Sequence, residues 1–273
     1  MRLSLSEIST VNASFEEDVI AYAAAGFDAI GLWEFKLPAD DEANLALLHE
    51  YGLEVAVCVP TIPAFLSLGI PGMEGPDDPA ERVEALCASV ARLARYSPET
   101  VVCLSGPLGD RSEAEGRALV VDGLRRVAAA ARTADVLLAF EPIHRSQRDG
   151  SSFVNSIEAA LGILAEAGTA EVGILLDTYH VWDDPAVWDF IARASYRIAG
   201  VHVADWPVDA TRADRELPGR GISRTKELIE ALELSGWDGI LDVEIFGDPE
   251  GYWGLDVAEA ARQAHAAIVA VVG

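Results

Sequence analysis

Short apolar runs alternate with amphipathic segments along the whole chain. Runs of five to seven mostly apolar residues bounded by polar residues or glycine are typical of buried strands, whereas apolar residues three and four positions apart are typical of helices. The predicted strands cover residues 2–6, 27–33, 53–59, 100–105, 136–141, 172–177, 197–203 and 239–245. The predicted helices cover residues 14–26, 41–52, 78–96, 112–134, 155–168, 184–195, 223–236 and 256–273.

This regular alternation predicts an α/β fold, the (β/α)₈ TIM barrel, in which each of eight parallel strands is followed by a helix. An open doubly wound sheet is the rival, but it rarely needs eight regular units. No segment has the composition of a linker, so a single domain over residues 1–273 is expected. Two long connections, residues 60–77 and 204–222, follow predicted strands. We therefore expect both at the carboxyl-end face of the barrel, where active-site loops lie.

Four consecutive predicted strands carry a polar residue at or near the carboxyl end. The fifth ends in Glu141 and the sixth in Asp177, the seventh carries His202, and the eighth carries Glu244. Each of these alone has a structural explanation, such as a loop cap, an ion pair or a hydrogen-bonded core histidine. Three carboxylates at one height would repel one another unless a cation held them. Together, the four residues indicate a metal site.

Three carboxylates and one imidazole suit one hard or borderline divalent ion, with Mn²⁺ as the first choice and Mg²⁺, Co²⁺ and Zn²⁺ also admissible. Structural zinc sites usually contain thiolate, and Cys58, Cys87 and Cys103 are not part of this set. We therefore expect a catalytic metal with open positions for substrate oxygens. His180, three residues after Asp177, is expected to contact the substrate or to support a ligand.

Composition and charge limit the partners and the location. The net charge of -25 repels a phosphate backbone, so neither nucleic acid nor an anionic membrane is an expected partner. The first ten residues lack an apolar signal core, and no run reaches the roughly 18 apolar residues of a membrane span. An odd number of cysteines without a CxxC pair favours reduced thiols. The protein is expected to be soluble and cytoplasmic.

Around the same positions, five motifs resemble the sugar phosphate isomerase/epimerase family of xylose isomerase-like TIM barrels. The resemblance covers essentially the whole chain and is carried by FEPIH at 140–144, LLDTYH at 175–180, GVHVADW at 200–206, LPGRG at 217–221 and DVEIFGD at 242–248. The motifs are specific for the superfamily and much less so for the substrate. By position, the resemblance implies one divalent metal held by Glu141, Asp177, His202 and Glu244.

The resemblance also implies a chemistry. The two glutamates of the metal set, Glu141 and Glu244, would move the proton, and His180 would contact the substrate, a small sugar, keto-polyol or related acid. A metal that chelates a carbonyl oxygen and the neighbouring hydroxyl stabilises an enediolate. Two bases on opposite sides of the substrate would permit epimerisation, and one base serving both carbons would give aldose-ketose isomerisation. Relatives often associate, so a homodimer or homotetramer is expected.

Two positions depart from the family pattern. Many sugar epimerases of this group have Asn where His144 stands and Glu where Gln147 stands. The change at Gln147 removes a charged acceptor that usually contacts a sugar hydroxyl. His144 is either a general base aimed at a substrate hydroxyl or an α-proton, or a residue that only hydrogen-bonds a ligand or the loop.

Residues at the mouth of the predicted barrel are candidates for substrate binding. Trp33 and Glu34 follow the second strand and resemble rim residues of the family. The Trp33 ring would either stack on a sugar face or pack under the 60–77 connection. Arginines near the mouth are candidates for a phosphate or carboxylate of the substrate. The other aromatic and basic candidates are Trp206, Trp182, Phe246, Arg215 and Arg220.

Three alternatives stand beside a metal-dependent isomerase or epimerase. One is a metal-dependent dehydratase or lyase on a keto-sugar or keto-inositol, including deglycosylation of a 3-keto glycoside, with His144 as base. Another is an apurinic endonuclease, but these relatives carry additional histidines and a basic DNA groove, which the charge balance disfavours. The third is a non-catalytic sugar-binding barrel, which open metal positions disfavour.

Overall fold

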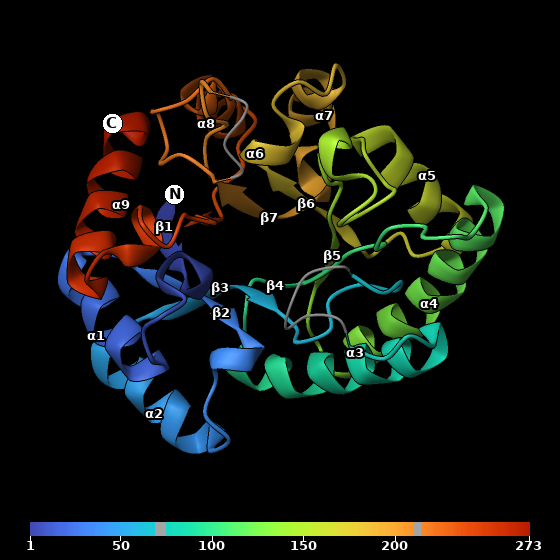
Figure 1. Ribbon diagram of the computed structural model, residues 1–273, viewed down its shortest axis with the longest axis horizontal. Helices are drawn as coiled ribbons and strands as arrows, with labels where there is room; N and C mark the ends of the chain where they lie inside the picture. The colour runs from blue at the N-terminus through green and yellow to red at the C-terminus, as the bar shows by residue number, and fades with distance from the viewer. Residues whose placement is uncertain (69–74, 210–213) are drawn as a thin grey trace.

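Eight parallel strands close into a barrel in the computed structural model, which describes residues 1–68, 75–209 and 214–273. Each strand pairs with the next along the chain and the eighth pairs with the first, so the predicted (β/α)₈ barrel is confirmed (Figure 1). The strands are β1 (Arg2–Ser6), β2 (Ala29–Trp33), β3 (Glu54–Val59), β4 (Thr100–Cys103), β5 (Leu138–Phe140), β6 (Gly173–Asp177), β7 (Ile198–Val203) and β8 (Ile240–Val243).

Helices surround this barrel, and the last helix packs beside the first, which completes the outer ring (Figure 1). The α-helices of the described residues are α1 (Phe15–Ala25), α2 (Asp41–Tyr51), α3 (Pro79–Leu93), α4 (Glu113–Thr133), α5 (Ile157–Ala167), α6 (Thr178–Val181), α7 (Val187–Ala194), α8 (Thr225–Leu234) and α9 (Val257–Val272). Short 3₁₀ turns lie at η1 (Glu7–Thr10), η2 (Glu34–Lys36), η3 (Ala94–Tyr96), η4 (Arg145–Gln147), η5 (Ser195–Arg197) and η6 (Tyr252–Gly254). None of these helices combines the length and apolar character that a membrane span needs.

Local sequence signals explain where helices begin and end. Ser14 caps α1 in a capping box, as its sequence position predicts: its hydroxyl accepts the Glu17 N–H, and the Glu17 carboxylate accepts the Ser14 N–H. Helix α1 ends at Gly26, whose φ of 98° lies in the left-handed region that glycine adopts without strain. The sequence did not predict α6, which starts because an oxygen of Asp177 accepts the Tyr179 N–H at 2.8 Å.

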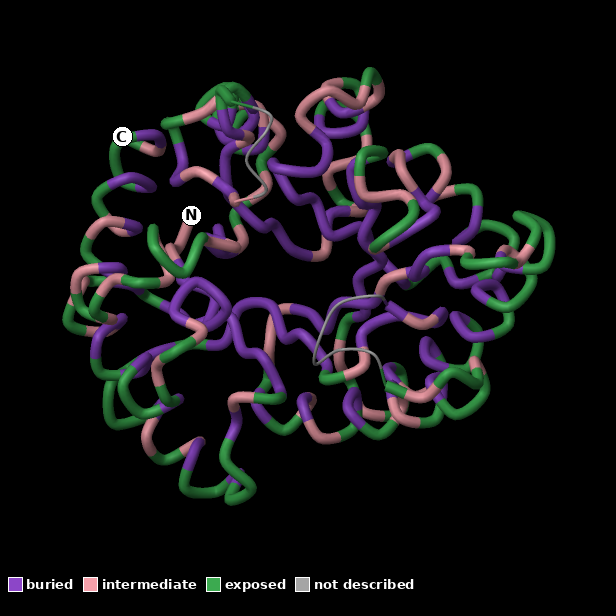
Figure 2. The backbone as a smooth tube through the Cα atoms, in the orientation of Figure 1, coloured by how far each residue is buried: buried purple, intermediate pink, exposed green. Residues whose placement is uncertain are grey.

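The core has two layers, one between the strands and the helices and one inside the barrel. Figure 2 shows buried residues along the central strands and exposed residues on the outer helices. The barrel interior is filled mostly by apolar side chains, which leaves its carboxyl end to hold a site. The main interior residues are Ile8, Trp33, Val57, Val59, Val102, Ala139 and Leu175.

The two long connections are described in part. Residues 69–74 and 210–213 of the predicted loops 60–77 and 204–222 lie outside the described residues. The described parts are pinned to neighbouring strand ends: the Phe65 N–H donates to the Leu104 carbonyl, and the Arg215 N–H donates to the Phe246 carbonyl. The described parts of both loops therefore lie at the carboxyl-end face of the barrel.

Candidate metal centre and substrate cavity

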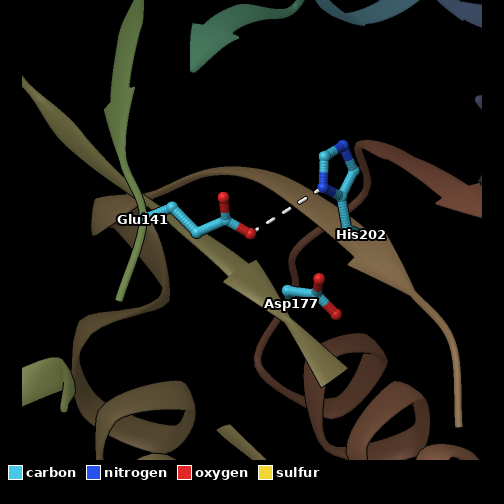
Figure 3. Close-up of side chains that lie close together, drawn as sticks. All are labelled: Glu141, Asp177 and His202. Carbon is cyan, nitrogen blue, oxygen red and sulfur yellow. Dashed lines mark ion pairs between the residues drawn. The ribbon is translucent and has the colours of Figure 1, made fainter. Parts of the chain in front are cut away.

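Three buried side chains from consecutive strands converge at the carboxyl end of the barrel. Glu141 follows β5, Asp177 ends β6, and His202 lies in β7. Each offers one ligand atom, and these atoms lie within 4.8 Å of one another (Figure 3). An oxygen of Glu244, just beyond β8, lies 3.4 Å from His202 Nδ1, so the structure brings all four predicted ligands together.

The chemistry of this donor set fits a divalent cation. Burial lowers the pKa of His202 to about 4, so the imidazole is neutral and has a lone pair to offer. Its Nδ1 faces the carboxylates, 3.9 Å from Glu141 Oε1 (Figure 3), and has no hydrogen-bond partner among the described residues. Burial and the charge of Asp177 raise the pKa of Glu141 well above its usual range. A cation would reduce the repulsion between the carboxylates and would give the Nδ1 lone pair a partner.

Arg215 supplies positive charge beside the same carboxylates. Its Nη1 donates to Asp177 Oδ2 at 2.8 Å and to Glu244 Oε2 at 2.9 Å. The guanidinium also lies over the ring of Tyr179, 4.6 Å from its centroid, and over that of Phe246 at 4.8 Å. Although buried, its pKa is raised by Asp177 and Glu244. The predicted substrate-binding arginine thus also holds two of the proposed metal ligands.

His180 lies between the main chain of His144 and the Arg215 guanidinium. Its Nδ1 lies 3.2 Å from the His144 main-chain nitrogen and its Nε2 lies 3.2 Å from Arg215 Nη2. Both neighbours are donors, and a neutral imidazole has one acceptor nitrogen, so the ring accepts a hydrogen bond from one of them. Burial, together with the charge of Arg215, lowers the His180 pKa well below its usual value. The Nε2 atom also lies 3.7 Å from Asp177 Oδ2, and His180 lines the cavity.

A cavity of about 210 Å³ opens beside the four predicted metal ligands. Polar side chains that follow β5 to β8 line one side of the cavity, which we call the polar arc. Apolar side chains in or after β2 to β4 line most of the other side, which we call the apolar arc. Such an asymmetric wall orients a small ligand by its polar end. The polar lining residues are Glu141, Gln147, Ser151, Tyr179, His180, His202, Arg215 and Glu244. The apolar lining residues are Trp33, Val59, Pro63, Leu68, Val102, Leu104, Ile143 and Phe246.

His144 lies behind this wall and does not line the cavity. Its Nδ1 accepts the Ser146 N–H at 3.2 Å, and its Nε2 lies 3.3 Å from Asp183 Oδ1. The ring also packs on Trp206, with centroids 4.4 Å apart. Burial lowers the His144 pKa. In this arrangement its main chain fixes His180 while its ring holds the loop after β5.

The other predicted rim residues divide into two groups. Trp33 lines the cavity, and its indole N–H donates to Ser6 Oγ at 2.9 Å. Glu34 points elsewhere, because its carboxylate accepts the Thr61 N–H at 2.9 Å and supports the loop after β3. Trp206 lies behind Tyr179, stacked on its ring with centroids 4.7 Å apart. Trp182 lies beside Trp206, and Arg220 lines a separate groove near α9.

Sequence reasoning missed three residues that build this site. Tyr179 lines the cavity and packs under the Arg215 guanidinium. Asp205 organises the loop that carries Arg215, since its carboxylate accepts the N–H groups of Gly219 and Ser223, each at 2.7 Å. Asp242 is buried in β8, two residues before Glu244 and therefore on the same strand face. That period-two spacing was the available signal for Asp242.

Comparison with known proteins finds enzymes among the relatives. A D-psicose 3-epimerase of Enterocloster bolteae is 28% identical over 166 residues, which is 60% of this chain and 50% of that protein. A 3-dehydroshikimate dehydratase of Pseudomonas aeruginosa is 24% identical over 262 residues, which is 91% of this chain and 38% of that protein. The chain thus spans half or less of the length of these two relatives.

Solved structures with the same fold cover nearly the whole chain. A protein from Sinorhizobium meliloti superposes with a TM-score of 0.85 at 26% identity, covering 98% of both chains. The IOLI protein, solved with a bound zinc atom, superposes with a TM-score of 0.80 at 22% identity, covering 100% of this chain and 98% of that one.

A family model described as a xylose isomerase-like TIM barrel matches residues 19–269. The match extends from α1 to α9 and so includes the strands that carry the buried carboxylates and His202. The chain belongs to the xylose isomerase-like TIM barrel family.

Proposed function

We propose that the protein is a divalent-metal-dependent isomerase or epimerase of a small sugar, keto-polyol or related acid. One observation carries the proposal: the buried carboxylates of Glu141, Asp177 and Glu244 surround the unpartnered Nδ1 of His202 beside a cavity. Without a cation that nitrogen would stay unpartnered, and Arg215 alone would have to balance three carboxylates. Mn²⁺ is the first choice, and the zinc atom in the IOLI structure supports a divalent ion in this fold.

A bound divalent ion would supply Lewis-acid polarisation of a substrate carbonyl, and Glu141, Asp177, His202 and Glu244 would hold it. The remaining chemistry belongs to side chains of the chain. In an epimerisation, one glutamate removes the proton from carbon to leave an enediolate, and the other returns a proton to the opposite face. In the metal-free protein, burial raises the pKa of Glu244 to about 7, and a bound divalent ion would favour the carboxylate that takes up a proton.

Two neighbouring side chains would bind the substrate oxygens on which charge develops. Arg215 offers a guanidinium whose position is fixed by Asp177 and Glu244, and His180 lies beside it, with Nε2 3.2 Å from Arg215 Nη2. Both groups line the cavity, so we propose that they bind the oxygens of the reacting carbons. Gln147 and Ser151 lie on the same polar arc, where they would bind a further hydroxyl.

The apolar arc limits the other end of the substrate. Side chains such as Val59, Leu68 and Leu104 offer no hydrogen bonds there, and Trp33 offers a ring face. We propose that this arc takes the less polar end of the substrate or the apolar face of a sugar ring. Glu34 and Trp206 support neighbouring elements, and their predicted contact with substrate stays a prediction.

Turnover on a panel of candidate substrates tests the proposal. Purified protein loaded with Mn²⁺ is offered ketoses, inosose-type compounds and hydroxypyruvate in deuterated water, and deuterium at the reacting carbon is measured. We expect exchange with wild type and a loss of at least about 100-fold in Glu244→Gln, in line with general acid-base catalysis. Glu158→Gln, an exposed glutamate of α5, is the matched control. Full activity of metal-free protein would contradict metal dependence.

A dehydratase or lyase is the second candidate, because one relative is named 3-dehydroshikimate dehydratase. In the form considered from the sequence, His144 would be the base. The His144 ring contacts Ser146, Asp183 and Trp206 outside the cavity wall, which favours the isomerase. Loss of water from a keto-sugar that disappears in His144→Ala, with metal still bound, would favour the lyase.

A further inference from the structure

Asp242 places a carboxylate inside the barrel, directly beneath the proposed metal centre. It lies in β8 between two inward-facing neighbours, since its Cα pairs with Ser4 of β1 on one side and with His202 of β7 on the other. Its side chain is completely buried. The surrounding interior is mostly apolar, and burying a carboxylate there is costly unless a hydrogen-bond or charge partner compensates it.

The two oxygens of Asp242 have different surroundings. Oδ1 accepts a hydrogen bond from Ser4 Oγ at 2.7 Å. Oδ2 has no hydrogen-bond partner among the described residues, and His202 Nε2 lies 3.6 Å from it. Nε2 also lacks a partner within the described part of the chain. Two unpartnered, buried polar atoms therefore face each other.

Space for this carboxylate is provided by a glycine. A Cβ atom added to Gly31 of β2 would lie 2.1 Å from Asp242 Oδ2. Any side chain at Gly31 would push the carboxylate out of its position below His202. The absence of a side chain on β2 thus permits the approach of Asp242 to the ring.

We propose that Asp242 is a positioning residue that holds His202 as the Nε2–H tautomer, so that the Nδ1 lone pair points at the proposed metal. This inference rests on the metal site of the proposed function. Ser4 Oγ already donates to Oδ1, and Oδ2 faces Nε2, so a proton on Nε2 gives each of these two unpartnered atoms a partner. The separation of 3.6 Å is longer than a hydrogen bond, so the two atoms interact as an electrostatic attraction across the interior of the barrel.

The tautomer of His202 also determines whether Nδ1, on the opposite side of the ring, can bind a metal. A neutral imidazole carries one proton, so fixing it on Nε2 leaves Nδ1 free to coordinate. Nδ1 is the nitrogen close to Glu141 and Glu244, and it would be lost as a ligand in the other tautomer. A carboxylate behind a metal-binding histidine also fixes the ring orientation, and removal of such a partner typically weakens metal binding 10- to 100-fold.

Two measurements test the assignment. Nitrogen-15 NMR of histidine-labelled, metal-free protein reports the tautomer of His202, which we expect to be Nε2–H in wild type and mixed in Asp242→Ala. Titration with Mn²⁺ should show about 10- to 100-fold weaker binding in Asp242→Ala and a smaller loss in Asp242→Asn, which keeps a neutral acceptor. Asp18→Asn, an equally buried aspartate of α1 with its partners in Thr10 and Lys36, should bind Mn²⁺ like wild type.

The outcomes separate this inference from the proposed function. A wild-type His202 protonated on Nδ1, or wild-type Mn²⁺ affinity in Asp242→Ala, would overturn the role of Asp242. If wild type binds none of the divalent ions, the proposed metal chemistry fails, and the wild-type NMR spectrum still decides the tautomer. If Asp242→Ala does not fold, the wild-type spectrum and the affinity of Asp242→Asn give the answer.

Discussion

Single buried residues decide how the charges at the proposed metal centre coexist. Arg215 is 8% exposed and contacts Asp177 and Glu244, so it stabilises carboxylates that would otherwise repel each other. The same contact makes Arg215 a partner of the metal ligands as well as a candidate for substrate binding. Its removal should therefore affect the metal-free protein more than the metal-loaded one.

We expect Arg215→Met to lower the free energy of unfolding by about 3–5 kcal/mol in EDTA, because two buried carboxylates lose their cation. Saturating Mn²⁺ should restore part of the loss by neutralising the same groups. Urea denaturation with and without Mn²⁺ measures both. Arg193→Met, which removes an exposed pair with Asp189, should cost less than about 1 kcal/mol. Equal losses in the two variants would contradict the role given to Arg215.

Glu7, a buried acid outside the proposed metal ligands, makes stability depend on pH. Its Oε2 accepts the Trp33 N–H at 2.7 Å. Burial raises its pKa from 4.5 to about 8, with a further rise from Asp18 and an opposing effect of Lys36. Because folding raises this pKa, the folded state keeps the proton while the unfolded state loses it. The contribution of Glu7 to the free energy of unfolding is therefore greatest below pH 4.5 and falls as the pH rises toward 8.

We expect Glu7→Gln to flatten the fall of unfolding free energy between pH 5 and pH 8 by at most about 1.4 kcal/mol per pH unit. Urea midpoints at several pH values, compared with wild type, isolate the contribution of Glu7. Glu16→Gln, an exposed acid of α1, should keep the wild-type slope. The same slope in Glu7→Gln and wild type would show that Glu7 titrates alike in the folded and unfolded states.

At the scale of elements, the loop after β7 illustrates how one side chain shapes a segment. The main chains of Asp205 and Glu216 exchange hydrogen bonds at 2.8 and 2.9 Å, and the Asp205 carboxylate binds two further N–H groups at 2.7 Å. Glu216 is next to Arg215, so this pairing sets where the arginine enters the cavity. Asp205, at the start of the loop, thus fixes the position of residues further along it.

We expect Asp205→Ala to lower the free energy of unfolding by about 2–4 kcal/mol, because the N–H groups of Gly219 and Ser223 lose their acceptor. If Arg215 stabilises the charge that develops on the reacting oxygens, kcat should fall more than KM rises. Chemical denaturation and steady-state kinetics measure the two effects. Asp248→Ala, an exposed loop aspartate that accepts the Glu250 N–H, serves as the control with a loss below about 1 kcal/mol. A loss at Asp205 no larger than that control would contradict the anchoring role.

At the scale of the whole molecule, barrel closure brings together residues that lie more than 100 positions apart. Glu141 and Glu244 are separated by most of the second half of the chain, yet both line one cavity. A ligand that bridges β5 to β8 would therefore hold half of the barrel together. We therefore expect a bound metal to stabilise the whole fold against unfolding. Oligomeric association stays a prediction.

We expect Mn²⁺ at 100 times its dissociation constant to raise the free energy of unfolding by about 2.7 kcal/mol, because it binds only the folded barrel. Thermal unfolding should shift upward by about 2–4 °C for each kcal/mol. Differential scanning calorimetry across a Mn²⁺ series measures this. Glu141→Ala, which lacks one proposed ligand, should show a much smaller shift. An equal shift in that variant would point to non-specific binding by the acidic surface.

The sequence alone determined the eight strand-helix units, the helix cap at Ser14 and the barrel, because apolar periodicity and capping are local properties. It also indicated Glu141, Asp177, His202 and Glu244, since the carboxyl ends of parallel strands meet on one face of a barrel. Seven of the eight strands were predicted one to three residues too long, mostly at the amino end, where the pairing begins later than the predicted run.

Tertiary structure alone decided which way loop side chains point. A loop has no period that fixes direction, so packing with distant elements sends the His144 ring behind the wall and brings Arg215 in between two carboxylates. The partner of Asp242 depended on strand register, which sequence spacing within one strand does not specify. The local pattern thus determined the elements and their polar ends, and long-range packing determined which of those polar groups face one another.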